Sequence, residues 1–541
     1  MSTPTRPLTT PRLGTTAISR RTLLQGLTAL GVGASLFGAA GCESAVSQAG
    51  TAADTSTPQR GGTIQAGIAA DVIPGNFLTN PNTGITTIIG LAYDFLIRYP
   101  NDKVEPTPAL ATAWQLGEDG KSLTLELRDD VTFHSGRPFT SKDVEFSIKT
   151  YADPLWTAQL RSTAAAVTSF DTSEEHKITL GFEHPLGNIF DLLDTVPILD
   201  SESIDELRQG SKFVGTGPFT VSGWKPNTSI SFARNEKYWV PERPYADAVE
   251  VKVITDAKAL LSALKSGQIQ FANGLSSLDV ENLTKGDDFT KIRLEGAEKQ
   301  LYVGSNVTAK PLDDVRVRQA IAYALDKDRV VAEVLRGSGY TASLPWPKYS
   351  SAYDEAANST YTRDVDKAKQ LIAEVGTIPK LPLTYNPTPI QEALAAIVQS
   401  NLGEVGIPIE LDPVDGAQFV KQLIGAKFKG LWIATHSWAQ YTPSTLTVSA
   451  YPFNAHKNAS HYDDAAYTAA ADGAWEVADG ASAEAVAAYQ KVSDELLKGS
   501  FLAEIAIYWE QWASSAQLQG AGYTKRSELL LTDAWLTTAG S

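Results

Sequence analysis

One stretch of the sequence combines aromatic rings with neutral polar side chains that can hold a small molecule. Between Asp415 and Asp463 the chain has no Asp, Glu or Arg. Aromatic faces, amides and hydroxyls suit a neutral or masked ligand, such as a sugar, a blocked peptide or a metal chelate. That this stretch forms a ligand site is implied by the family resemblance given below, and the alternative is that most of its aromatic residues belong to the core. The candidate residues of the site, two of them from earlier in the chain, are Trp432, His436, Trp438, Gln440, Tyr441, Trp346 and Asn306.

Three histidines of the same region could contact a metal that arrives as a chelate. They are His436, His456 and His461. Their spacing matches no pair on one face of a helix. We predict no metal site built by the protein itself and no cofactor.

The sequence lacks the short motifs of common hydrolases and nucleotide-binding enzymes. It contains no Gly-x-Ser-x-Gly, no His-Glu-x-x-His and no glycine-rich nucleotide loop. So acidic a chain offers many pairs of carboxylates that can act in catalysis. An exported hydrolase is therefore an alternative. We expect a binding protein and not an enzyme.

The charge of the chain argues against nucleic acid as a partner. The formal net charge is −16, and it becomes −20 if residues 1–41, with four arginines and no acid, are removed. Such a protein repels phosphate backbones and anionic lipid headgroups. The single cysteine, Cys42, excludes an intramolecular disulfide.

The amino terminus has the parts of an export signal. Arg20-Arg21 precedes an apolar run from Leu27 to Ala40, and small residues lead to Cys42. The paired arginines resemble a twin-arginine signal, and Ala39-Ala40-Gly41-Cys42 resembles a bacterial lipobox in which the cysteine is acylated. A membrane-spanning helix is the alternative, but the run is short and rich in glycine. We expect a lipid anchor at Cys42, a flexible tether over 42–60 and a place on the outer face of the cytoplasmic membrane.

Strand and helix patterns alternate along the rest of the chain, which predicts α/β layers with largely parallel sheets. The expected strands lie at 63–68, 121–127, 230–233, 249–253 and 407–411. The expected helices, most with an Asp as N-cap and a Gly as stop signal, lie at 257–266, 314–325, 326–337, 364–375, 389–405 and 482–498.

Four segments together resemble the bacterial extracellular solute-binding proteins of family 5, the peptide/nickel importer class. They run from Leu110 to Val144, from Val214 to Trp239, from Leu312 to Gly337 and, more weakly, from Ala368 to Gly376. The first contains Phe133-His134-Ser135-Gly136-Arg137-Pro138-Phe139, which also has a plain structural interpretation. It is a turn that enters a helix with Thr140 or Ser141 as cap and Asp143 in the first turn.

The resemblance implies a two-lobed, type II periplasmic-binding-protein-like α/β fold with an extra subdomain on the first lobe. Ligand would lie between the lobes, and hinge closure would bury it. The two crossing segments that form the hinge would lie near 294–303 and 507–513. The implied parts are a signal peptide (1–41), a tether (42–60), lobe I (61–89, 205–296 and 510–541), its subdomain (90–204) and lobe II (297–509).

The resemblance also implies a partner and a ligand class. We expect a monomeric protein that delivers one small organic solute, peptide or peptide-like, to the membrane subunits of an ABC importer. Peptide-binding members carry an Asp for the peptide amino terminus in a loop that matches Trp432–Leu446. This loop has no acid here, which argues against a free-amine peptide because a buried ammonium needs a partner. An oligosaccharide or a metal chelate is the alternative ligand. A sensor that binds its ligand without transport is the alternative function.

Overall fold

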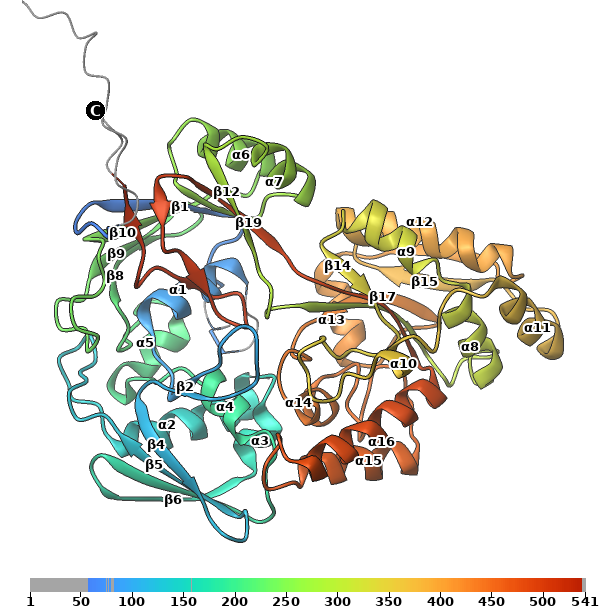
Figure 1. The fold of residues 1–541 in the computed structure, drawn as a ribbon, viewed down its shortest axis with the longest axis horizontal. Coiled ribbons are helices and arrows are strands. Elements are labelled where there is room, and N and C mark those ends of the chain that lie inside the picture. The colour runs from blue at the N-terminus through green and yellow to red at the C-terminus, as the bar shows by residue number, and fades with distance from the viewer. Residues whose placement is uncertain (1–56, 74, 76, 79–81, 157, 538–541) are drawn as a thin grey trace, which may run out of the picture. The chain divides into compact units, whose positions relative to one another are not determined.

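Two large β-sheets and one smaller sheet organise the described part of the chain (Figure 1). The structure, a computed structural model, describes residues 57–73, 75, 77–78, 82–156 and 158–537. These residues belong to one structural unit. The expected signal peptide, the expected acylation site Cys42 and most of the expected tether lie outside the described residues.

The first large sheet has seven strands in the order β12-β19-β11-β1-β10-β9-β8. Their bounds are β1 Thr63–Ile68, β8 Phe219–Lys225, β9 Ser229–Arg234, β10 Ala248–Val253, β11 Phe271–Asn273, β12 Phe289–Arg293 and β19 Gln511–Ser515. Only the pairs of β1 with β10 and with β11 are parallel among these strands.

The second large sheet has six strands in the order β14-β18-β13-β17-β15-β16. Their bounds are β13 Lys299–Ser305, β14 Gly339–Thr341, β15 Leu381–Tyr385, β16 Ile409–Pro413, β17 Leu431–His436 and β18 Leu502–Tyr508. Here β15 runs parallel to β16 and β17, and the other pairs are antiparallel. The expectation of largely parallel sheets is therefore wrong. Strands that follow a hairpin, or that enter the sheet from the other large sheet, are antiparallel to their neighbours.

The small sheet and short two-stranded ribbons complete the β structure. The small sheet has the order β4-β5-β7-β6, with β4 Ala111–Leu116, β5 Ser122–Leu127, β6 Val167–Glu174 and β7 Lys177–Phe182. The ribbons pair β2 Ile97–Arg98 with β3 Thr107–Pro108, β20 Leu518–Gln519 with β23 Trp535–Leu536, and β21 Gly522–Tyr523 with β22 Leu529–Leu530.

The helices fall into three groups along the chain. Those before residue 210 are α1 Thr83–Ala92, α2 Ser141–Ala152, α3 Arg161–Ala165, α4 Ile189–Thr195 and α5 Ile204–Gln209. Next come α6 Ala257–Lys265, α7 Ser277–Leu283, α8 Val315–Ala324, α9 Lys327–Arg329, α10 Glu355–Asn358, α11 Val365–Val375 and α12 Pro389–Glu404. The last are α13 Gly416–Ile424, α14 Pro443–Ser449, α15 Ala465–Trp475 and α16 Ala483–Gly499.

Most expected helices are confirmed because their end signals are local. The side chain of Asp256 caps α6, and Asp364 caps α11. The helix expected at 326–337 is different: α9 gives way to a π-helical turn over Val330–Val334. The strand expected at 407–411 begins two residues later, at Ile409.

The chain crosses between the two large sheets twice. Residues 294–298 connect β12 to β13, and residues 509–510 connect β18 to β19. The two crossings are joined where Leu294 N–H donates to the Glu510 carbonyl at 3.0 Å and Lys299 forms an ion pair with Glu510. This is the topology of two lobes with a two-segment hinge, and the domain boundaries given above remain predictions.

Candidate ligand-binding site

One face of the six-stranded sheet carries a set of four polar side chains, of which His436 is partly exposed and the other three are buried. In the register of β13 and β17, Gln300 lies opposite His436, and Tyr302 lies opposite Ala434. On the other side of β13, Tyr302 lies opposite Glu504 of β18. Because side chains two residues apart point to the same face of a strand, all four polar side chains share one face. We call Gln300, Tyr302, His436 and Glu504 the polar sheet face.

A β-bulge in β18 brings Glu504 to this face. Leu301 pairs with Ala506 but Tyr302 pairs with Glu504, so that Ile505 is skipped. Without the extra residue, Ile505 would lie opposite Tyr302, and Glu504 would point to the opposite, apolar face. That opposite face belongs to a separate hydrophobic core that includes Leu301, Val303 and Ile505.

The polar sheet face holds several groups without hydrogen-bond partners among the described residues. They are both carboxylate oxygens of Glu504, both amide atoms of Gln300, the Tyr302 hydroxyl and Nε2 of His436. Gln300 and Tyr302 are fully buried, and Glu504 is 3% exposed. Buried polar atoms are nearly always paired in folded proteins, so these groups call for hydrogen-bond partners such as water or a bound solute.

Burial sets the protonation of these groups. Burial raises the pKa of Glu504 to about 8, although the positive charge of Lys327 acts to lower it. Burial also lowers the pKa of Lys327 to about 7 and the pKa of His436 to about 4. The Lys327 ammonium donates to the Ala342 carbonyl at 2.7 Å and to Ser343 Oγ at 3.1 Å, and it makes no ion pair with Glu504 in the described structure. The face is therefore largely uncharged near neutral pH.

The candidate residues Trp432 and Trp438 each stack on another aromatic ring. Trp432 stacks on Phe428 with ring centroids 4.6 Å apart, and its ring covers Gly304. Trp438 has a positive φ of 90° and stacks on Tyr441 at 5.6 Å. A non-glycine residue in this backbone region costs free energy and is frequent at functional sites.

Gln440 and Tyr441 contact residues that precede or follow the six-stranded sheet in the chain. The Gln440 side chain accepts from the Trp438 N–H and donates to the Lys525 carbonyl at 2.8 Å. The Tyr441 hydroxyl donates to Asp194 at 2.6 Å. In this structure both side chains therefore connect the two predicted lobes, and their contact with a ligand remains a prediction.

Trp346 and Asn306 have their polar groups occupied by the protein. Trp346 is fully buried and donates to Ser493 Oγ at 2.8 Å. The Asn306 amide donates to the Phe428 carbonyl at 2.8 Å, and its oxygen accepts from Thr308. That these two residues touch a ligand stays a prediction.

The histidines of this region do not converge. His456 contacts Asp472 at 2.8 Å, and His461 contacts the Ala426 carbonyl at 2.7 Å. Across the described residues there is no group of three or more His, Cys, Asp or Glu side chains that could hold a metal ion.

Helix α4 contributes a second polar cluster, which binds the segment just after the candidate loop. Asp191 accepts four hydrogen bonds: from the Tyr99 hydroxyl at 2.9 Å, from both the N–H and the hydroxyl of Thr442 at 3.0 Å, and from the Thr445 hydroxyl at 2.6 Å. The Asn188 amide also donates to the Thr445 hydroxyl at 2.9 Å. We call Asn188, Asp191 and Asp194 the α4 clasp.

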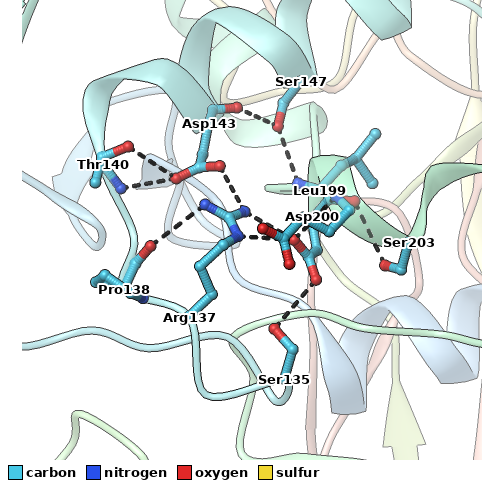
Figure 2. A network of polar contacts seen from close by, with 10 residues as sticks. Ser135, Arg137, Pro138, Thr140, Asp143, Ser147, Leu199, Asp200 and Ser203 are labelled. Atoms are coloured by element: carbon cyan, nitrogen blue, oxygen red, sulfur yellow. Dashed lines mark hydrogen bonds and ion pairs between the residues drawn. The ribbon is translucent and has the colours of Figure 1, made fainter.

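The motif around Arg137 has a structural role. Figure 2 shows its guanidinium between Asp143 and Asp200, with contacts of 2.7 and 2.8 Å. Thr140 is the N-cap of α2 and forms a capping box with Asp143. The interpretation of this segment as a turn that enters a capped helix is confirmed. His134 is likewise packed, with Nε2 3.0 Å from the Gly217 carbonyl.

Sequence reasoning missed Glu504, Gln300, Tyr302 and the α4 clasp. A usable signal existed for Glu504, because it is the one acid in the apolar run from Leu502 to Tyr508. A signal for the clasp was the spacing of Asn188, Asp191 and Asp194, which places three polar groups on one side of a helix.

The fold and this site define an extracellular solute-binding protein, and comparison with known proteins gives the family. Residues 105–460, about two thirds of the chain, match the model of the bacterial extracellular solute-binding proteins, family 5 (middle). The chain belongs to this family. None of the described helices is long and apolar enough to cross a membrane.

Individual relatives are similar over most of the chain. The oligopeptide-binding protein AppA of Bacillus subtilis is 28% identical over 405 residues, which cover 68% of this chain and 72% of AppA. Among solved structures, the binding protein AgaA of A. tumefaciens R10 in complex with agropinic acid has a TM-score of 0.77 at 23% identity and covers 88% of this chain and 99% of AgaA. NikA of Brucella suis in complex with Fe(III)-EDTA has a TM-score of 0.77 at 20% identity, with coverage of 88% and 100%.

Proposed function

We propose that this chain captures one small organic solute, of the peptide or peptide-like class, between its two lobes and delivers it to the membrane subunits of an ABC importer. The observation that carries the proposal is the polar sheet face, where buried hydrogen-bonding groups lie without partners among the described residues. Family membership supplies the transport context. The oligopeptide relative supports the peptide class.

The α4 clasp supports a closure mechanism. It forms hydrogen bonds between residues of the predicted lobe I subdomain and residues 441–445 of the predicted lobe II. These contacts require the two parts to be close together. A solute that contacts both lobes shifts the population toward this state, because only there does it make its full set of contacts.

The proposal includes binding without turnover and attachment to the membrane through Cys42. Supporting the attachment are the lipobox-like sequence and the tether-like composition that follows it. Supporting binding without turnover are the family and the absence of common hydrolase motifs from the sequence. We also propose that the protein acts as a monomer.

Mass spectrometry of the solute that copurifies with the protein from its native cells tests this function. The expected result is one small organic molecule per chain, unchanged after incubation, and loss of its uptake when the chain is deleted. A chemically altered product would favour an enzyme. Normal uptake in the deletion strain would favour a sensor.

A further inference from the structure

Glu504 stands out on the polar sheet face as a carboxyl group without a donor. Both oxygens lack a hydrogen bond, and the side chain is 3% exposed. Its β-bulge places it on the face of Tyr302 instead of the face of Ile505. Tyr302 itself packs against Phe453, with ring centroids 5.6 Å apart. Bulges often re-aim a side chain next to a functional site.

Among the titratable groups that act on Glu504, Lys327 is positive and its charge lowers the pKa of the carboxyl, but the two side chains form no ion pair in the described structure. Tyr302, from β13, has a pKa well above its ordinary value because of burial and the nearby Glu504, and it stays neutral. His436, from β17, has a pKa of about 4 and is also neutral near pH 7. Lys327, from α9, directs its ammonium to Ala342 and Ser343.

We propose that Glu504 is a specificity-determining residue that pairs with a cationic group, an ammonium or a guanidinium, of the bound solute. This inference rests on the proposed function and names the chemistry of its ligand. The unpartnered amide of Gln300 and hydroxyl of Tyr302 lie on the same face and can accept or donate further hydrogen bonds to that group. The acid missing from the loop after β17 is thus supplied by strand β18 of the same sheet.

A proton release follows from this pairing. In the free protein the pKa of Glu504, about 8, keeps the carboxyl largely protonated at pH 7. An arriving cation favours the carboxylate, so the pKa falls in the complex and the proton passes to solvent. No covalent bond to the solute forms. Affinity for a cation that keeps its proton, such as the lysine side chain of N-acetyl-Ala-Lys-Ala, should therefore rise as the pH increases from 6 to 8 and level off above that range.

The test is calorimetric titration of the full chain, freed of copurified solute, with three probes. Trialanine carries a cation at its amino terminus. N-acetyl-trialanine carries no cation, and N-acetyl-Ala-Lys-Ala carries one on its lysine side chain. At pH 7 we expect at least one cationic probe to bind about tenfold or more tightly than N-acetyl-trialanine. Titrations in two buffers of different ionisation enthalpy should report proton release for that probe alone.

The variant Glu504→Gln keeps the shape of the side chain and removes its charge. It should lose both the preference for the cationic probe and the proton release. The matched control is Glu410→Gln, an exposed glutamate of β16 in the same sheet, which should retain both.

Other outcomes overturn the inference in distinguishable ways. If N-acetyl-trialanine binds as well as the cationic probes, or if Glu504→Gln keeps the preference, solute capture stands and the role of Glu504 is wrong. A copurified solute without a positive charge leads to the same conclusion. If no probe binds and no solute copurifies, the proposed function itself is contradicted.

Discussion

At the scale of single residues, the energetic cost of burying Glu504 is the main reason to propose that the six-stranded sheet contributes to binding. A carboxyl group inside an apolar strand is unfavourable unless it is paired. Within the described residues Glu504 has neither a hydrogen bond nor an ion pair. A residue retained only for folding would be better replaced by an apolar side chain.

Replacing Glu504 with Gln should change how stability depends on pH. The pKa of Glu504 in the folded chain, about 8, lies above the ordinary value of 4.5. Between these two pH values the folded chain therefore binds one proton more than the unfolded chain. The contribution of Glu504 to the stability of the wild type then falls as the pH rises toward 8. The free energy of unfolding of the variant, minus that of the wild type, should therefore increase from pH 5 to pH 8 and then level off. Urea unfolding at several pH values measures this difference, and a flat difference would contradict the assignment.

Gly304 is needed because Trp432 lies directly over it. A Cβ added at residue 304 would be 2.2 Å from the indole ring. Gly304→Ala should therefore displace Trp432 and destabilise the protein by about 1–3 kcal/mol. Gly403→Ala on α12 is the control, because a Cβ there meets nothing within 4 Å; it should be neutral or stabilise by up to about 1 kcal/mol. Equal melting temperatures for the two variants would refute this packing argument.

At the scale of elements, α4 and α14 are held together by buried polar groups. The Thr445 hydroxyl donates to Asp191 and accepts from Asn188. Asp191 is fully buried, and burial raises its pKa to about 6 against the hydrogen bonds of Thr445, Tyr99 and Thr442. Because each hydrogen bond offsets part of this burial cost, the clasp depends on all of its donors.

Thr445→Val should weaken the contact between α4 and α14. The substitution removes the donor of the shortest hydrogen bond to Asp191 and leaves the Asn188 amide with one acceptor fewer. We expect the free energy of unfolding to fall by about 1–3 kcal/mol. The matched control is Thr447→Val on the same helix, whose hydroxyl contacts only the Ser444 carbonyl at 3.4 Å within α14. Chemical unfolding and hydrogen exchange at Tyr441 and Thr442 measure the effect. Faster exchange with Thr447→Val than with Thr445→Val would contradict it.

Elements with local signals can be predicted from the sequence, and long-range contacts cannot. The cap at Asp364 and the stop at Gly376 are determined by neighbouring residues, and the helix predicted there is α11. The bulge in β18 depends on its pairing with β13, about 200 residues earlier in the chain. Asn188 and Thr445 are 257 residues apart. No sequence pattern within either segment specifies such a partner.

The candidate site illustrates the same limit. Composition is enough to single out the aromatic residues of β17 and the loop after it. The structure stacks Trp438 on Tyr441, whereas Trp432 lies within β17 and stacks on Phe428. The prediction of a neutral ligand rests on that loop alone. Glu504 comes from another strand, and only the sheet register brings it beside Tyr302.

At the scale of the whole molecule, the proposed closure of the lobes would bend the chain at the two crossing segments. Only residues 294–298 and 509–510 connect the two large sheets in the described chain. Tyr349 contacts the first crossing through Glu298 at 2.8 Å. A few residues between rigid elements are typical of hinges that close around a ligand. In the proposed function, the importer distinguishes loaded from empty protein by this change of shape.

Small-angle X-ray scattering of the chain with and without its copurified solute tests closure most directly. The account predicts a smaller radius of gyration when the solute is bound, and the larger value again once the solute has been removed. Identical scattering curves for the two samples, with mass spectrometry confirming bound solute in one of them, would contradict capture by closure of the lobes.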